Sequence, residues 1–136
     1  MPSLDFAFLA DAAEAEPGRK FYVLGGGIDQ IGGQSFPLVH PHMALVMRWV
    51  INPTEMNLRH HLEVRLVDAD GQQLAKIEGD IEASGGAPMG REAGVNMVIN
   101  LTNTRFEKPG DFAFEVLMNN QHFKSLGLRV ATVPVA

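Results

Sequence analysis

Apolar and polar residues alternate with a period of two along much of this 136-residue chain. Successive side chains of an extended strand point to opposite faces of a sheet, so this alternation predicts strands that bury one face and expose the other. The pattern is clearest in 110–119, 61–68 and 95–101. The residues expected to face a core are Phe112, Phe114, Val116, Met118, Leu62, Val64, Leu66, Val95, Met97, Ile99 and Leu101.

One segment is apolar on both faces. Residues 43–51 carry a charge only at Arg48, which is typical of a central strand that is covered on each side, and Trp49 is expected to anchor the core. Residues 5–16 are rich in Ala and Glu and would also suit a helix. The alternation of apolar residues that begins at Leu4 favours a strand there instead.

Turn residues separate these segments. Asp70-Gly71 and Asn119-Asn120 suit the positive φ angles of tight turns, because Gly, Asn and Asp tolerate the left-handed region better than other residues. Each pair lies between two apolar runs and therefore predicts an antiparallel hairpin. Pro17-Gly18 predicts a further hairpin, which joins the N-terminal strand to 20–25.

Together these features predict an all-β fold: a two-layer antiparallel β-sandwich, immunoglobulin-like or related, with about eight strands. Residues 1–136 are expected to form a single domain, because no linker or internal repeat divides them. The hydrophobic content of 46% and the charged content of 20% are ordinary for a globular domain. A chain of this length can bury a core without disulfides or metal.

Composition argues against several classes of function. A net charge of -5 and scattered basic residues argue against nucleic-acid binding, which depends on Lys and Arg at phosphates. A chain without cysteine forms no disulfide or Cys-ligated metal site and suits a reducing compartment. The N-terminus does not resemble a secretory signal, and the longest apolar run, 43–51, is too short to cross a membrane. We expect a cytoplasmic protein that binds no cofactor, nucleic acid or membrane.

Histidines are the residues that suggest metal chemistry. His40 and His42 are two residues apart, so on a strand both side chains point the same way, in a spacing that zinc sites use. His60 or His61 could supply a third ligand if the strand at 43–51 paired with 60–69. Surface or hydrogen-bonded histidines are commoner than ligands, so the sequence does not predict a metal site. The full set is His40, His42, His60, His61 and His122.

Glycine-rich segments are expected to be loops. The run Gly25-Gly26-Gly27 is not followed by a helix or by a Lys-Ser/Thr pair, which a phosphate site would need, so a steric role is expected. Residues 25–41 and 83–94 are expected to form long irregular loops, and loops on a rigid sheet often bind partners. The residues expected to bind there are Gly26, Asp29, Gln30, Met89 and Arg91.

Four segments of the chain resemble a known family. They are 9–14 (LADAAE), 22–27 (YVLGGG), 66–71 (LVDADG) and 109–116 (PGDFAFEV). Through them the chain resembles a family of small bacterial proteins of unknown function, over 4–130. The resemblance implies a compact bacterial β domain without an assigned reaction, and it identifies no catalytic residue.

The sequence favours non-enzymatic binding of a protein partner over catalysis. The partner would contact the loops at 25–41 and 83–94, or an open strand edge. Such an edge can also join a second copy of the chain into a homo-oligomer. The alternative is a small metal-assisted enzyme or metal-binding protein that uses His40, His42 and His60 or His61. Serine hydrolysis is not expected, because none of the serines lies in a Gly-x-Ser-x-Gly motif.

Overall fold

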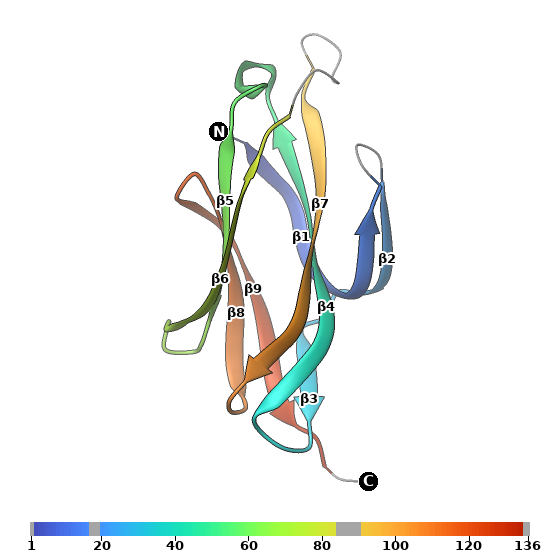
Figure 1. Cartoon of the computed structure of the whole chain (residues 1–136), viewed down its shortest axis with the longest axis vertical. Coiled ribbons are helices and arrows are strands. Elements are labelled where there is room, and N and C mark those ends of the chain that lie inside the picture. Colours follow the sequence, from blue (N-terminus) through green and yellow to red (C-terminus); the bar gives the residue numbers. More distant parts are fainter. Residues whose placement is uncertain (1, 17–19, 84–90, 135–136) are drawn as a thin grey trace.

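The structure, a computed structural model, describes residues 2–16, 20–83 and 91–134, and these are almost entirely β-structure (Figure 1). One turn of 3-10 helix, η1 (Pro53–Glu55), interrupts the described strands. Within the described ranges, no helix has the length and apolar character needed to cross a membrane. The strands are β1 (Ser3–Ala15), β2 (Phe21–Gly26), β3 (Gln30–Gly33), β4 (Leu38–Ile51), β5 (His60–Val67), β6 (Gln73–Ile81), β7 (Ala93–Phe106), β8 (Gly110–Met118) and β9 (Gln121–Thr132).

The strands form two sheets that face each other along the long axis of the molecule (Figure 1). One sheet has the order β2-β1-β4-β7, and the other has the order β3-β9-β8-β5-β6. This arrangement confirms the predicted all-β sandwich. The prediction of purely antiparallel pairing is wrong in one place, because β3 runs parallel to β9, with Ile31 opposite Val130. The five-stranded sheet is therefore mixed.

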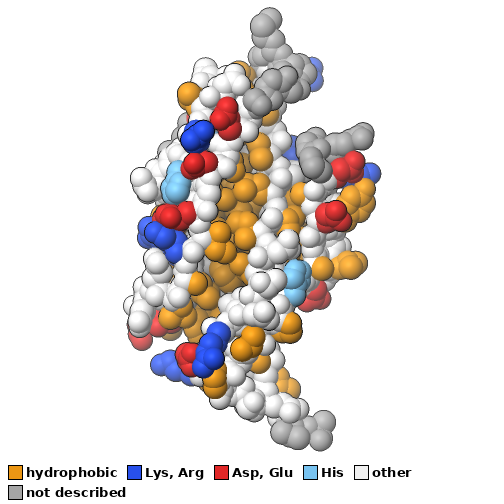
Figure 2. All heavy atoms as spheres, in the orientation of Figure 1, with side chains coloured by type: hydrophobic (Ala, Val, Ile, Leu, Met, Phe, Trp, Pro, Cys, Tyr) orange, Lys and Arg blue, Asp and Glu red, His pale blue; other side chains and the backbone are white. Residues whose placement is uncertain are grey.

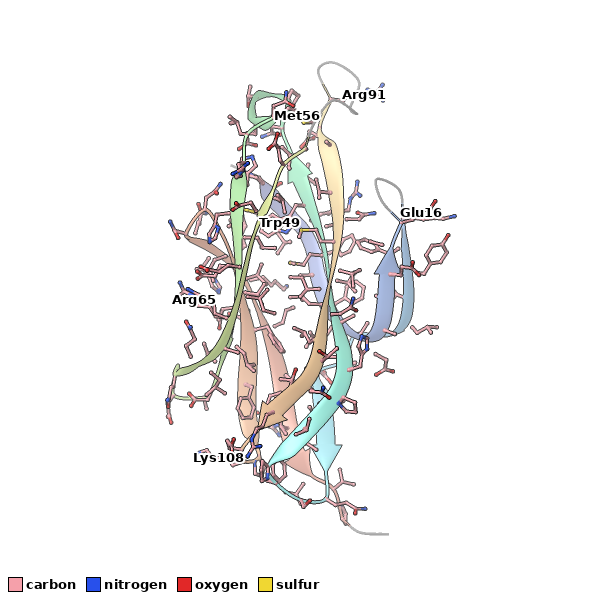
Figure 3. The ribbon with its side chains drawn as sticks, viewed as in Figure 1. Glu16, Trp49, Met56, Arg65, Arg91 and Lys108 are labelled. Carbon is pink, nitrogen blue, oxygen red and sulfur yellow. The ribbon has the colours of Figure 1, made fainter. Side chains whose placement is uncertain are left out.

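The inward faces of the two sheets form one core. β4 lies between β1 and β7, as predicted for the segment that is apolar on both faces. The indole of Trp49 is fully buried between the sheets (Figure 3) and packs edge-on against the ring of Phe123, with 5.1 Å between the centroids. Burial of such apolar surface is the main force that holds the two sheets together. The fully buried side chains that β4 points into the core are Met43, Leu45, Met47, Trp49 and Ile51.

The tight turns predicted at Asp70-Gly71 and Asn119-Asn120 are present, whereas Pro17-Gly18 lies outside the described residues. Asn119 and Asn120 have φ angles of 51° and 66° and connect β8 to β9. Gly71, with φ of 82°, lies in the turn between β5 and β6. The carboxylate of Asp68 accepts hydrogen bonds there from the backbone N–H groups of Asp70 (3.0 Å) and Gln72 (2.9 Å). Local backbone chemistry thus specifies both hairpins.

The hairpin of β1 and β2 bends away from the sandwich (Figure 1). β1 pairs with β4 as far as Ala10, and beyond that residue it pairs with β2. Gly25, with φ of 62°, lies beside the bend, where a Cβ atom would be only 2.1 Å from a carboxylate oxygen of Asp11. Glycine permits both the backbone conformation and the close approach, which is the steric role that the sequence predicted.

The predicted long loop at 25–41 is wrong. β3 occupies part of this segment and β4 begins at Leu38. A Cβ atom on Gly32 would lie 2.2 Å from a methyl carbon of Val133, and one on Gly33 would lie 2.5 Å from a methyl carbon of Leu38. These glycines therefore mark a crowded strand. Glycine content alone led to the wrong interpretation, because it does not distinguish a loop from a close contact.

Candidate functional site

The histidines that the sequence grouped as possible metal ligands belong to different sheets. His40 and His42 lie on β4 in the four-stranded sheet, whereas His60 and His61 lie on β5 in the five-stranded sheet. β4 pairs with β1 and β7, so the pairing with β5 that could have supplied a third ligand does not form. The structure does not bring these four side chains into one site.

Three of these histidines make hydrogen bonds within the fold, and His61 does so in the charged cluster described below. Nδ1 of His42 lies 2.9 Å from the carbonyl oxygen of Asp11. His60 is buried, with Nδ1 3.1 Å from Nδ2 of Asn119 and Nε2 3.3 Å from the carbonyl oxygen of Glu55. The amide of Asn119 donates to Nδ1, and Nε2–H donates to the carbonyl, so the neutral Nε2–H tautomer of His60 satisfies both contacts. His60 thereby joins the turn η1 to the β8–β9 hairpin.

A charged cluster on the outer face of β5 and β6 has the spacing of metal ligands. Within the part of the chain that the structure describes, His61, Glu63 and Glu78 place ligand atoms within 4.8 Å of one another. Nζ of Lys76, however, lies 3.7 Å from Oε1 of Glu63 and 3.2 Å from Oε1 of Glu78. Arg65, which points away from the sandwich in Figure 3, also pairs with Glu63. Because cationic side chains already bind both carboxylates, this cluster is an ion-pair network across two strands.

The network shifts two pKa values. Hydrogen bonding to Asp80, with 3.1 Å between Nδ1 and Oδ1, is the largest cause of the raised pKa of His61, and Glu78 adds to it. A hydrogen bond from Lys76, reinforced by its charge, lowers the pKa of Glu78. Both shifts favour the charged forms. Because these side chains are exposed to water, each pair contributes little to the stability of the fold.

His122, Ser125 and Glu115 form a second polar cluster, with the residue types of a hydrolase triad. A triad histidine uses one ring nitrogen for the serine and the other for the acid. Here Nε2 of His122 lies 3.2 Å from Oγ of Ser125 and also contacts Oε2 of Glu115, so a single nitrogen meets both groups. Partial burial would raise the pKa of Glu115, but hydrogen bonds from Ser125 and His122 lower it. This geometry indicates a surface hydrogen-bond cluster.

The residues expected to bind a partner through loops do not form one site. Gly26 ends β2, Asp29 is an exposed residue that precedes β3, and Gln30 begins β3. Arg91 is exposed at the opposite end of the molecule from β3 (Figures 1 and 3). Met89 lies outside the described residues, as does most of the segment 83–94.

The most prominent surface feature is a groove along one side of the sandwich, between the edge strands β6 and β7. Adjoining hollows of about 450, 300 and 160 Å³ follow this side. Figure 2 shows hydrophobic side chains in a vertical band between the two strands. We call this feature the open groove. Its apolar lining consists of Leu62, Val64, Leu66, Leu74, Ala75, Ile77, Ile81, Met97, Ile99, Leu101, Phe112 and Phe114.

The open groove exposes the side of the hydrophobic core. Its floor includes Phe114, which is 3% exposed, whereas Leu74 and Ile77 on β6 are 46% and 39% exposed. Met97 and Ile99 of β7 face inward, as predicted, but they are only partly buried. Among the described strands, none covers these side chains, so the groove is a surface on which apolar groups remain in contact with water.

β6 presents a long edge beside this groove, and the one irregularity in its pairing with β5 lies at its first residues, where the register shifts between Leu66 and Val67. It has nine residues and no proline, and β5 is its one partner among the described strands. Proteins usually blunt such edges with proline, lysine, bulges or inward-pointing charges, and of these the middle of β6 has only Lys76. The charged residues Lys76, Glu78 and Asp80 lie on the outer face, where they contact side chains of β5. Ile77 faces the groove, so the edge is able to accept another strand.

Sequence reasoning anticipated an open strand edge but did not identify β6. Its inward positions include Ala75, Ile77 and Gly79, opposite Leu66, Val64 and Leu62 of β5, and end at the buried Ile81. Two small side chains at inward positions cannot fill a core layer. This shortage of apolar volume in 73–81 was the sequence signal that could have located the open groove.

Comparison with curated protein sequences finds no match for this chain. A family model matches residues 5–131, from the third residue of β1 to the next-to-last residue of β9, and therefore includes both sheets and the open groove. The expected membership of a family without an assigned function is confirmed, and the bacterial origin stays a prediction. The chain belongs to a family of unknown function (DUF6941).

Proposed function

We propose that this protein is a non-enzymatic binding module that recognises an extended segment of polypeptide at the open groove. The observation that carries the proposal is the exposure of inward-facing apolar side chains between two strand edges that no described strand covers. A strand added to β6 would satisfy the backbone groups of the edge and cover the groove at the same time.

In strand addition, main-chain hydrogen bonds provide affinity and side-chain contacts provide specificity. Main-chain hydrogen bonds to β6 would hold the added segment in register, and every second side chain of that segment would enter the open groove. Leu74 and Ile77 would lose most of their remaining exposure, which contributes roughly 1 to 2 kcal/mol in total. The two smaller hollows, of about 300 and 160 Å³, provide further apolar contacts along the groove.

The chemistry of the groove favours a polypeptide over a nucleic acid. Two of the cations at its rim are engaged, because Lys76 pairs with Glu63 and Glu78, and Arg105 pairs with Glu107 at 2.6 Å. The net charge of the chain, -5, would also repel phosphates. We expect the binding to take place in a bacterial cytoplasm, since a chain without cysteine suits a reducing compartment.

The proposal is tested by selecting peptides from a random display library on the purified protein. We expect the selected peptides to carry apolar residues at alternate positions and to protect the backbone amides of β6 from hydrogen exchange. Ile77→Lys places a charge in the open groove and should weaken their binding about tenfold or more. Leu24→Lys is the matched control, because Leu24 is 72% exposed on β2, in the other sheet.

Two outcomes would overturn the proposal. One is a library that yields no peptide with affinity above the background. The other is a set of peptides that bind wild-type protein and Ile77→Lys equally well. Fluorescence of Trp49, the single tryptophan, verifies that each variant has kept its core.

A further inference from the structure

We infer that the strand accepted by β6 is β6 of a second copy of this chain, which gives a two-fold symmetric dimer with one continuous sheet. The inference rests on the proposed function, because it names the partner of the same edge. It is carried by the order of charged and apolar residues along β6 and by the charges that face β6 from β5.

An antiparallel pair of identical strands has a central residue that lies opposite itself. When that residue is Ile77, Lys76 lies opposite Glu78 of the second copy, and Glu78 lies opposite Lys76 of the second copy. Opposite charges that face each other across two strands are stabilising. Both pairs form on the outer face of the sheet, and Ile77 meets its own copy on the inner face, beside the open groove.

Neighbouring centres do not give this complementarity. A pair centred on Lys76 places that lysine opposite its own copy. A pair centred on Glu78 places Lys76 opposite Asp80, but it also places Glu78 opposite its own copy at the centre. A pair centred on Gly79 places Glu78 opposite Asp80. Like charges that face each other directly are destabilising, so among these four centres Ile77 is favoured, because it gives two attractive pairs and no repulsive pair.

Within the single copy, the charged residues of β5 that lie directly opposite Lys76 and Glu78 have the same sign as these residues. β5 and β6 place Arg65 opposite Lys76, and Glu63 opposite Glu78, so that both cross-strand pairs have like charges. Diagonal contacts offset the repulsion, such as the 3.7 Å approach of Lys76 Nζ to Oε1 of Glu63. In the dimer each of these pairs gains an opposite charge on the free side of β6, which is what an edge adapted to its own copy requires.

The dimer also covers part of the exposed apolar surface. Ile77 lines the same hollow as Met97 and Ile99, which face it across the open groove. A second β6 alongside Ile77 would therefore exclude water from this stretch of the groove, where Figure 2 shows the band of hydrophobic side chains. Near the two-fold axis, the same contact therefore pairs the two β6 edges and covers apolar side chains of the open groove.

Charge exchange at positions 76 and 78 tests the inference by sedimentation equilibrium over a range of protein concentrations. We expect a reversible dimer for the wild type. Lys76→Glu and Glu78→Lys, each alone, should raise the dimer dissociation constant about tenfold or more, because two attractive pairs become repulsive. An equimolar mixture of the two variants should form a heterodimer, and the double variant K76E/E78K should dimerise like the wild type.

Lys124→Glu, on the exposed part of β9, is the matched control and should leave the dimer intact. A wild type that stays monomeric at every concentration overturns the dimer while leaving peptide selection at β6 unaffected. Single variants that dimerise as tightly as the wild type also overturn it, because the contact then lies elsewhere. Failure of the proposed function has a different result: the library yields no peptide that binds at β6, whether or not the protein forms a dimer. Heterodimer formation by the mixture excludes misfolding as the cause of monomeric single variants.

Discussion

Nδ1 of His42 lies 2.9 Å from the carbonyl oxygen of Asp11, where β1 stops pairing with β4 and bends toward β2. Nε2 of the same ring lies 3.3 Å from Oδ1 of Asn100 on β7. One imidazole thus connects three strands of the four-stranded sheet. Because Asp11 precedes the part of β1 that pairs with β2 alone, this ring holds the base of the projecting hairpin.

Substitution of His42 should therefore loosen that hairpin. We expect His42→Ala to lower the free energy of unfolding by about 1 kcal/mol, the usual contribution of a hydrogen bond, and to accelerate amide exchange in β2. Urea unfolding followed by Trp49 fluorescence gives the free energy. His40→Ala is the control on the same strand, because His40 makes no side-chain hydrogen bond with the described residues. Equal losses in the two variants would contradict the role of His42.

Asn119 should be the most sensitive position of the β8–β9 turn. Its φ is 51°, and its Oδ1 accepts a hydrogen bond of 2.9 Å from the backbone N–H of His61. Its Nδ2 lies 3.1 Å from Nδ1 of the buried His60. Asn119→Ala should cost about 2 to 4 kcal/mol, because it strains the backbone and leaves a buried ring nitrogen without its donor.

Glycine substitutions at this turn separate the cost of backbone strain from the cost of the lost side-chain hydrogen bonds. Asn119→Gly keeps the positive φ accessible but removes both side-chain hydrogen bonds, so it should cost about 1 to 2 kcal/mol. Asn120→Gly should be close to neutral, since Asn120 has the same backbone requirement, with φ of 66°. Thermal unfolding measures all three variants. A neutral Asn119→Ala would show that the side-chain contacts contribute nothing.

Local backbone chemistry made much of this fold predictable. The turn preference of Asn119 and the period-two alternation that ends at Met118 depend only on residues that are close in sequence. The strands and the hairpins between them could therefore be predicted. The parallel pairing of β3 was not predictable, because it depends on a partner, Val130, almost a hundred residues away along the chain.

The candidate site was less predictable than the fold. Period-two alternation places Met97 and Ile99 on the inward face, and the structure confirms this orientation. It does not indicate whether the opposite sheet is wide enough to cover them, because that depends on how two separate sheets are aligned. The alternative in which His60 or His61 joins His40 and His42 in a metal site depended in the same way on sheet assignment, because it required β4 to pair with β5, and the two strands lie in different sheets.

Gly25 should not tolerate a side chain. Its φ is 62°, and a Cβ atom would lie 2.1 Å from Oδ2 of Asp11. We expect Gly25→Ala to lower the free energy of unfolding by about 1 to 2 kcal/mol. Gly127→Ala is the control, because a Cβ atom there meets nothing within 4 Å. The double variant Asp11→Ala/Gly25→Ala removes the obstructing carboxylate and should retain only the backbone cost. Stability of Gly25→Ala equal to that of the wild type would contradict this explanation of the bend.

His61 should titrate above its ordinary pKa of 6.5, because Asp80 and then Glu78 stabilise the imidazolium. A raised pKa in the fold means that this stabilisation is fully present below the pKa of the unfolded chain and is lost as pH rises through the folded value. The loss therefore falls above pH 6.5 and removes the cross-strand attraction between His61 and the carboxylates of β6. NMR titration of the ring protons gives the pKa directly. In Asp80→Asn the midpoint should fall toward 6.5, and urea unfolding of His61→Gln should show less dependence on pH in this window than the wild type. A wild-type midpoint at or below 6.5, or one that Asp80→Asn leaves unchanged, would show that these carboxylates do not bind the charged ring.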